Sequence, residues 1–292
     1  MFTILGATGK VGRTTIAALR QAGAPVRAVV RDVSRAEFLV DLGCEIAVAD
    51  LQDAHALTAA LQGSSTVQVI CPISPQGDDA AGDMLRSIDA IGTALEATSP
   101  TSVLAISDYG AEIAEGTGVT VLFHHLEERL RQLRARLTLV RSAEHMENWF
   151  RVTRAAAQTG MLPSLHHPLD KRFPTVSAFD LGGIAAELLL APADGQDSPR
   201  VIHVEGPRRY TALDVAEAVG ALLGRDIAAY MLPRPEWRTT LARGGLGESY
   251  IGLVTELYDA HNAGLIDARP GTDDIRHGRT DLVDALRRAA AN

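Results

Sequence analysis

Short apolar runs alternate with segments of helical periodicity through the first half of the chain. The apolar runs predict six strands, at residues 2–5, 25–30, 44–49, 67–71, 102–106 and 137–140. Between them, apolar residues three and four positions apart predict helices at about 13–22, 34–41, 54–61, 82–97 and 121–133. This alternation favours a parallel sheet with right-handed crossovers and helices on both faces. The predicted fold is therefore α/β, with a doubly wound parallel sheet of Rossmann type.

The alternation loosens beyond residue 141. Helices are predicted at 145–157, 180–190 and 211–223, strands at 173–176, 201–204 and 227–232, and a loop with two prolines at 162–168. The remainder is predicted to be mostly helical, with a break at 269–274. We expect a dinucleotide-binding domain at 1–142 with a return segment at about 174–204, and a smaller mixed α/β substrate lobe made of 143–173 and 205–292. The cleft between them is the expected ligand site.

A glycine-rich turn joins the first strand to the first helix. A dinucleotide pyrophosphate must approach bare backbone N–H groups at a helix N-terminus, and only glycine lets the chain come that close. The turn therefore predicts nucleotide binding, whereas the alternative is an ordinary glycine-rich connection. The residues expected to contact the cofactor here are Gly6, Thr8, Gly9, Lys10, Val11 and Gly12.

The residues after the second strand distinguish between the two nicotinamide dinucleotides. A ribose 2′-hydroxyl favours an acidic residue at this point, whereas a 2′-phosphate favours arginine. The strand ends in Arg31, and Arg35 follows one helical turn later. We therefore favour NADP over NAD, although Asp32 could hold the hydroxyls of NAD.

The ends of the third and fourth strands give further candidates for cofactor contacts. Asp50, followed by Leu51, is placed to meet the adenine, and it could equally cap the next helix. Cys71 and Pro72 are expected to pass beside the cofactor as a rigid wall.

Composition narrows the possible partners. The 292-residue chain carries 28 basic and 36 acidic residues, a net charge of −8, and has no basic run, so we expect no nucleic-acid partner. Cys44 and Cys71 lie in segments that we interpret as neighbouring buried strands, which favours core packing over a disulfide or metal site. The chain starts in a predicted strand without a charged leader, and no apolar run has transmembrane length. We expect a cytoplasmic protein without membrane contact.

The glycine turn and several later motifs together resemble the NmrA-like branch of the atypical short-chain dehydrogenases/reductases. The later motifs are Val30-Arg-Asp32, 49–53, 60–63, 139–148 with its Met-Glu-Asn, 179–182, 205–207 and 211–225. The resemblance spans roughly residues 1–235. It implies NAD(P)H binding, with some members that reduce quinones or small carbonyl compounds and others that only sense the cofactor and regulate a partner.

The chain lacks the catalytic pair of ordinary short-chain reductases, a tyrosine whose pKa is lowered by a lysine four residues on. Its only lysines, Lys10 and Lys171, do not follow any tyrosine at that spacing, which argues against tyrosine-dependent epimerase or dehydratase chemistry. Relatives without the tyrosine often carry a lysine shortly before a glutamate in the helix ahead of strand six. That place falls near Phe123, so His124 or His125 is a candidate substitute, unless the two face solvent.

Two further segments are expected to line the substrate site. After strand five, Ser107 could hydrogen-bond the substrate and Tyr109 could stack or donate, unless this segment only caps a turn. Past strand six, an apolar pocket for a flat ring is expected, with core packing as the alternative. Its predicted lining residues are His145, Met146, Asn148 and Trp149. Histidine and cysteine spacing predicts no metal site, and no Gly-x-Ser-x-Gly elbow occurs.

Two functions follow from these observations. The first is an NADPH-dependent oxidoreductase that passes hydride to a small quinone, carbonyl or imine-type acceptor, a reaction that needs orientation and water exclusion more than a strong general acid. The alternative is a non-catalytic NADP-responsive regulator read by a protein partner. The helices of such a fold also permit a homodimer.

Overall fold

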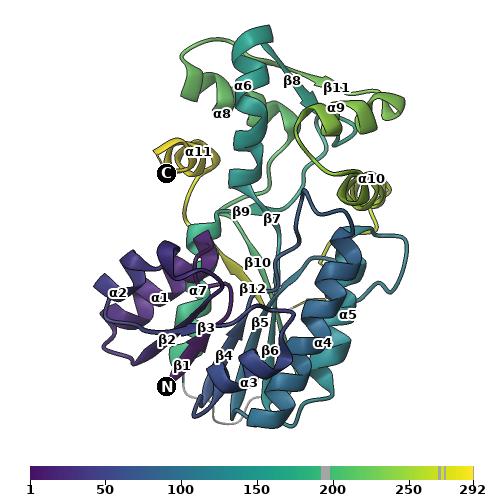
Figure 1. Ribbon diagram of the computed structural model, residues 1–292. Coiled ribbons are helices and arrows are strands. Elements are labelled where there is room, and N and C mark those ends of the chain that lie inside the picture. The colour runs from purple at the N-terminus through teal and green to yellow at the C-terminus, as the bar shows by residue number, and fades with distance from the viewer. Residues whose placement is uncertain (192–197, 269–270, 273, 292) are drawn as a thin grey trace.

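An eight-stranded parallel sheet forms the centre of the molecule. The computed structural model describes residues 1–191, 198–268, 271–272 and 274–291, and the backbone but not the side chain of Arg35. The strands of the sheet are β1 (Phe2–Ile4), β2 (Val26–Val30), β3 (Glu45–Val48), β4 (Thr66–Val69), β5 (Ser102–Asp108), β6 (Arg136–Ser142), β10 (Arg200–Glu205) and β12 (Ile275–His277). They pair in the order β12-β10-β6-β5-β4-β1-β2-β3, which confirms the predicted doubly wound fold (Figure 1).

The strand order places a switch point between β1 and β4. From β1 the chain proceeds outward through β2 and β3, and then returns to β4 and proceeds in the opposite direction. In such sheets, ligands bind outside the carboxyl ends of the strands at this reversal. The segments that follow β1 and β4 therefore border the expected ligand site.

Helices cover both faces of this sheet. They are α1 (Lys10–Gln21), α2 (Glu37–Asp41), α3 (Ala54–Leu61), α4 (Ala80–Thr98), α5 (Val119–Arg131) and α7 (Ala178–Leu190). Because successive strand side chains point to opposite faces, Ala28 and Val30 pack in the core beneath α1 and α2, whereas Val29 packs in the core beneath α3 and α4. Burial on both faces explains why these strands are almost continuously apolar.

A close helix contact fixes the start of α1. A Cβ atom at Gly182 in α7 would lie only 2.6 Å from the carbonyl oxygen of Val11 in α1. Thr15 also donates a hydrogen bond of 3.1 Å from its hydroxyl to the carbonyl oxygen of Gly182. The first turn of α1, next to the switch point, is therefore held against α7.

A second part of the chain stands beyond the carboxyl ends of the sheet strands (Figure 1). It contains β8 (Met161–Ser164) paired in parallel with β11 (Ala228–Met231), and β7 (Glu144–His145) paired in parallel with β9 (Thr175–Val176). Its helices are α6 (Phe150–Thr159), α8 (Ala212–Leu223), α9 (Trp237–Arg243), α10 (Glu248–Asn262) and α11 (Leu282–Ala291). A capping box between Thr211 and Asp214 begins α8.

Three features of local structure differ from the prediction. The proline-containing segment at 162–168 was expected to be a loop, but β8 includes Pro163 and pairs with β11. The C-terminal region is mostly helical, as expected, but it also supplies the unpredicted strand β12 to the main sheet. The two cysteines do not lie on neighbouring strands, because Cys44 precedes the edge strand β3 and Cys71 follows β4; both are free, and only Cys71 is fully buried.

Among the described residues, no helix is both long and apolar enough to cross a membrane. In the same residues, no group of three or more His, Cys, Asp or Glu side chains is arranged to hold a metal ion.

Candidate active site

The first and last glycines of the turn after β1 leave no room for a side chain. Gly6 has a φ of +72°, and a Cβ atom there would lie 2.8 Å from the Cβ of Ile70, which follows β4. A Cβ at Gly12 would lie 2.4 Å from the carbonyl oxygen of Gly6. These contacts bring the turn directly against the switch point.

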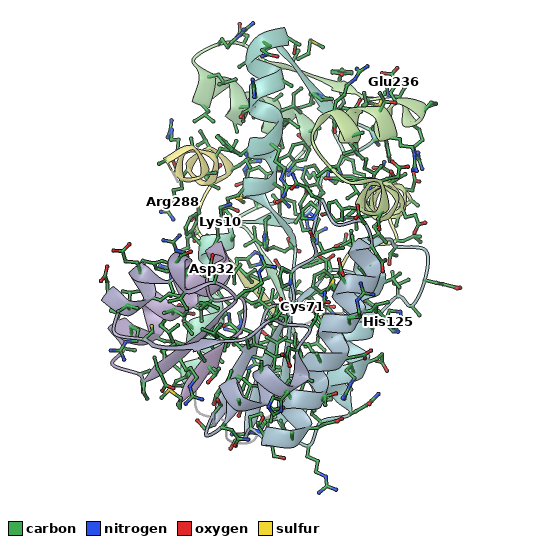
Figure 2. The ribbon with its side chains drawn as sticks, in the orientation of Figure 1. Lys10, Asp32, Cys71, His125, Glu236 and Arg288 are labelled. Atoms are coloured by element: carbon green, nitrogen blue, oxygen red, sulfur yellow. The ribbon has the colours of Figure 1, made fainter. Side chains whose placement is uncertain are left out.

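Gly9 plays a different part in the same turn. Its backbone is extended, with φ −77° and ψ 165°, and an added Cβ would make only an ordinary 3.5 Å contact with the Gly6 carbonyl. Gly9 is the N-cap of α1, and it supplies no side-chain cap for the helix. Unpartnered N–H groups at a helix N-terminus favour an anion, so this open cradle fits a pyrophosphate. Lys10, the first residue of α1, is exposed beside it (Figure 2).

The end of β2 carries the residues expected to distinguish NADP from NAD. Arg31 is exposed there, and the side chain of Arg35 lies outside the described residues. Asp32 caps a short 3-10 helix (Val33–Arg35), because its Oδ1 accepts hydrogen bonds from the backbone and hydroxyl of Ser34 at 2.9 and 2.8 Å. The Asp32 carboxylate thus has a local structural role.

Arg13 adds a second guanidinium near this end of the sheet. It projects from the first turn of α1 and stacks over the ring of Phe38 in α2, 3.7 Å from the centroid. The sequence analysis did not select Arg13, because only the contact between α1 and α2 gives it a defined position.

The proposed adenine contact after β3 also has a local partner. Asp50 is exposed, and its Oδ1 accepts a 2.9 Å hydrogen bond from the backbone N–H of Gln52. Leu51 packs against the core beneath α3 and α4. Asp53, rather than Asp50, caps α3, with hydrogen bonds of 3.0 Å from two backbone N–H groups.

A cavity of about 490 Å³ lies above the carboxyl ends of the sheet strands. It extends from Val11 in α1, past the segments that follow β4 and β5, to α6, α9 and α10. The predicted site residues that line it are Val11, Cys71, Pro72, Ser107, Tyr109, His145, Asn148 and Trp149. The cavity therefore brings together residues from both sides of the expected cleft.

Cys71 contributes bulk rather than reactivity to this wall. Its side chain is buried, and burial raises the pKa of its thiol to about 12. The thiolate is the nucleophilic form of cysteine, so this thiol is inert near neutral pH. Figure 2 shows Cys71 near the middle of the molecule, between the sheet and the second part of the chain.

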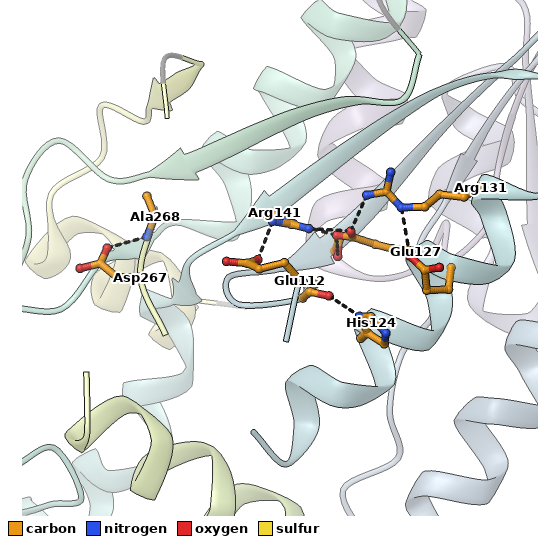
Figure 3. Close-up of polar contacts among 10 residues, drawn as sticks. Glu112, His124, Glu127, Arg131, Arg141, Asp267 and Ala268 are labelled. Carbon is orange, nitrogen blue, oxygen red and sulfur yellow. Dashed lines mark hydrogen bonds and ion pairs between the residues drawn. The ribbon is translucent and has the colours of Figure 1, made fainter. Parts of the chain in front are cut away.

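Ser107 belongs to a buried polar network with Glu127 and Arg141. Figure 3 shows the ionic part of this network, in which Arg141 contacts Glu127 and Glu112. The Ser107 hydroxyl donates to Glu127 at 2.7 Å, and Arg141 donates to both oxygens of Glu127 at 2.9 and 2.8 Å. Arg141 also pairs with Glu112 at 2.5 Å. Burial opposes ionisation of Glu127, but the hydrogen bonds from Arg141 and Ser107 outweigh it and hold its pKa below the usual range. The network locks the ends of β5 and β6 to α5.

Tyr109 is also fixed by a carboxylate. Its hydroxyl donates a 2.9 Å hydrogen bond to Glu205, which pairs with Arg209. Burial and the Glu205 carboxylate raise the pKa of Tyr109 well above its usual value. The ring lines the cavity, whereas the hydroxyl is committed to Glu205, so the structure supports ring contact rather than proton donation.

The two adjacent histidines on α5 do not line the cavity. Val119 and Phe123, four positions apart, form the cavity side of this helix, and neighbouring residues point about 100° away from each other. His124 instead bonds the carbonyl oxygen of Ala111 through Nδ1 at 2.9 Å, and His125 is exposed (Figures 2 and 3). These positions argue against the predicted chemical role for either histidine.

Met146 belongs to the core rather than to the predicted pocket lining. Its side chain is fully buried, and its Cε would lie 2.7 Å from a Cβ added to Gly206. His145, one residue earlier, does line the cavity, and burial lowers the pKa of its imidazole. The 3-10 helix at Met146–Trp149 explains the difference, because it turns successive side chains in different directions.

A second polar cluster lies on the α10 side of the cavity. Glu144 accepts hydrogen bonds from Tyr258 at 2.9 Å and from Nε2 of His166 at 3.2 Å. The His166 ring is fully buried and stacks on Phe173 with centroids 3.8 Å apart. The Trp149 ring lies beside this pair, with its centroid 5.9 Å from that of His166 and 6.0 Å from that of Phe173. The cluster gives the cavity a rigid aromatic wall.

Both lysines lie away from the tyrosines that line the cavity. The Nζ of Lys171 donates to the backbone carbonyl oxygens of His261 and Asn262 at the end of α10, and Lys10 is exposed at the start of α1. Tyr109 and Tyr258 bond carboxylates instead, and burial and the adjacent carboxylates raise their pKa values. This is the opposite of the environment that a lysine would create.

Several cavity residues were missed by the sequence analysis. They are Asp108, Glu144, Arg151, Tyr250, Tyr258 and His261. Asp108 and Glu144 are each next to a predicted site residue. Asp108 ends β5 and Glu144 follows β6, so their positions at the carboxyl ends of strands could have identified them from the sequence. The α10 residues have no such signal, because the path of that helix back over the sheet depends on tertiary packing.

Comparison with known proteins agrees with this geometry. The model of the NmrA-like family matches residues 1–273. The chain is 25% identical to the NAD(P)H azoreductase of Xenophilus azovorans, over 100% of this chain and 99% of that protein. The structure of Citrobacter sp. triphenylmethane reductase has a TM-score of 0.81 at 19% identity, covering 100% of this chain and 99% of that one. The NADPH complex of an Escherichia coli quinone oxidoreductase has a TM-score of 0.80 at 21% identity, covering 100% of both.

Proposed function

The chain belongs to the NmrA-like family, and from this premise we propose that it is an NADPH-dependent reductase that passes hydride to a flat aromatic acceptor. The observation that carries the proposal is the continuity of the cavity, which reaches from Val11 beside the glycine turn to Trp149, Tyr250 and Tyr258. A dinucleotide held at the turn and an acceptor held among these aromatic rings would share one enclosed space. Direct hydride transfer requires this proximity.

Each end of the cofactor has candidate partners in the chain. The open N-terminus of α1 at Gly9 would hold the pyrophosphate, and Arg31, with Arg13 nearby on α1, would hold the 2′-phosphate. When bound, NADPH supplies the hydride from its nicotinamide ring. The apolar residues Ile70, Pro72 and Ile106 would surround that ring at the ends of β4 and β5.

The surroundings of the cavity favour a mechanism without the tyrosine–lysine pair. The buried network of Ser107, Glu127 and Arg141 fixes the floor of the site, and the aromatic wall around Trp149 restricts the acceptor. Orientation and exclusion of water are the contributions expected from such a site. Phe123 lines the cavity at the place where some relatives carry a lysine, which adds apolar surface for a ring.

The acceptor class follows from the cavity and from the relatives. About 490 Å³ is within the range of pockets that bind small organic ligands. The relatives are an NAD(P)H azoreductase, a quinone oxidoreductase and a triphenylmethane reductase. Their named acceptors share an extended π-system that takes two electrons, and we assign the same class to this chain.

Steady-state oxidation of NADPH tests this function. NADPH absorbance is followed with 1,4-benzoquinone, an azo dye and crystal violet, while the dissociation constant for NADPH is measured by calorimetry. We expect tight binding and acceptor-dependent oxidation with at least one member of this panel. Tight binding without oxidation by any of them would contradict the reductase and favour the regulatory alternative.

The preference for NADPH provides a separate prediction. Arg31→Ala should weaken NADPH binding by about 2 kcal/mol, or roughly 30-fold, because one charge-assisted hydrogen bond to the 2′-phosphate is lost. Binding of NADH should change little. Arg134→Ala is the matched control, because Arg134 is exposed and precedes the amino end of β6, whereas Arg31 follows the carboxyl end of β2. Equal loss of both cofactors in Arg31→Ala would overturn the assignment of Arg31.

A further inference from the structure

Asp108 contributes a carboxyl group to the wall of the cavity. It is the last residue of β5, next to Ser107, and it is half-buried. Thr120, which is fully buried on α5, donates a 3.0 Å hydrogen bond to its Oδ2.

The neighbours of Asp108 favour its protonated form. Burial raises the pKa of Asp108 to about 7, and the hydrogen bonds from the Thr120 hydroxyl and the Tyr109 backbone offset only part of this effect. The carboxylates Glu127 on α5 and Glu144 on β7 add to the rise. Tyr250 on α10 and Arg151 on α6 line the same cavity.

We propose that Asp108 is the proton donor to the reduced acceptor, a role that rests on the proposed reductase function. Its position at the end of β5 places Asp108 on the wall of the cavity that the nicotinamide and the acceptor would share. Among the tyrosines of the cavity, the hydroxyls of Tyr109 and Tyr258 are already committed to carboxylates. Asp108 is the cavity carboxyl that can hold a proton near neutral pH.

With a quinone as acceptor, the C–H bond at C4 of the nicotinamide would break, and its hydrogen would pass to the quinone as hydride, one proton with two electrons. The quinone is reduced and NADPH is oxidised to NADP⁺. The O–H bond of Asp108 breaks, and its proton forms the O–H bond that completes the hydroquinone. The carboxylate then recovers a proton from water. An azo bond needs a proton in the same way, with N–H bonds formed.

A triarylmethane cation offers a chemical control, because it needs no proton. Hydride forms a C–H bond at the central carbon and neutralises the positive charge, which yields the complete product. A residue that only donates a proton therefore affects quinone reduction and leaves reduction of the cation unchanged. A residue that holds the fold or the cofactor affects both.

Asp108→Asn provides the test, since asparagine keeps the size and the hydrogen-bond acceptor for Thr120. We expect turnover of 1,4-benzoquinone to fall about 100-fold at pH 7, the scale of general acid catalysis, and turnover of crystal violet to stay within about twofold. Asp89→Asn makes the same change at an exposed position on α4 and should behave as wild type. An equal loss with both acceptors, or no loss with quinone, would overturn the assignment.

The pH dependence gives a second readout. Because the protonated form is active, wild-type quinone turnover should fall as the pH rises above about 7, whereas turnover in Asp108→Asn should lose this limb. Infrared difference spectra of the cofactor-free protein should show a protonated carboxyl that titrates near pH 7 and is missing in Asp108→Asn. A carboxyl that titrates in the ordinary aspartate range would contradict the proposal, even if no acceptor were reduced. Wild-type protein that reduces no acceptor would instead contradict the proposed function.

Discussion

Replacement of Gly9 by aspartate is expected to raise the dissociation constant for NADPH about a thousandfold without loss of stability. A carboxylate at this N-cap would lie against the pyrophosphate, and contact between like charges costs several kcal/mol of binding free energy. A loss of about 4 kcal/mol corresponds to a thousandfold higher dissociation constant. The apo protein should tolerate the change, because an added Cβ makes only a 3.5 Å contact and aspartate is a favourable N-cap. Calorimetric titration with NADPH and urea unfolding measure the two effects.

Gly9→Asn separates charge from size. Asparagine has nearly the shape of aspartate and is an equally good N-cap, so it should weaken NADPH binding much less, by about tenfold, through steric contact alone. Gly12→Ala should behave differently from both, because its Cβ would clash with the Gly6 carbonyl oxygen at 2.4 Å and distort the turn itself. Wild-type affinity in Gly9→Asp would show that the pyrophosphate does not bind at α1.

Arg141→Met should reduce the free energy of unfolding by about 3 to 5 kcal/mol, as measured by urea denaturation. Arg141 is 6% exposed and Glu127 is 1% exposed, so the variant leaves a buried carboxylate without its bidentate partner. Arg131→Met is the control. Arg131 also contacts Glu127, at 3.3 Å, but its side chain is 31% exposed, and its loss should cost less than about 1 kcal/mol.

The same network gives a dependence of stability on pH. The pKa of Glu127 is lower in the folded protein than in the unfolded chain, so its contribution is present above the unfolded pKa and is lost as the pH falls through the folded one. Arg141→Met should therefore flatten the acid side of the stability profile. The double variant Glu127→Leu/Arg141→Met should recover most of the loss, because no unpaired charge then remains in that pair. If the free energy of unfolding of Arg141→Met fell at low pH as steeply as that of the wild type, the Glu127–Arg141 pair would not be the source of the acid dependence.

The parallel sheet and the glycine turn after β1 could be predicted because their signals are local. Continuous apolar runs, the spacing of Gly6, Gly9 and Gly12, and the alternation with helices each follow from short-range physical constraints. β8 was missed because Pro163 suggested a loop, yet the two-stranded pair of β8 with β11 accommodates it. The place of β12 beside β10 depends on a long-range return of the chain that no local pattern specifies.

The roles of the side chains at the candidate site were less predictable, because each role depends on where the side chain points. His124 and Phe123 are adjacent in sequence, but only Phe123 faces the cavity. Tyr109 was correctly placed on the cavity wall, while its hydroxyl partner Glu205 lies far away in sequence. Asp108 and Tyr258 acquire their positions only when β5, α5 and α10 pack together. The sequence pattern does not specify which face of α5 points to the cavity, or which distant elements pack against these residues.

Transfer of deuterium is the most direct test of hydride passage within the cavity. NADPH that carries deuterium at both C4 positions is mixed with the protein and crystal violet, and the colourless product is examined by mass spectrometry. The account predicts one deuterium on the central carbon, where it does not exchange with water, and slower transfer than with unlabelled NADPH. Colourless product that forms without deuterium would contradict it.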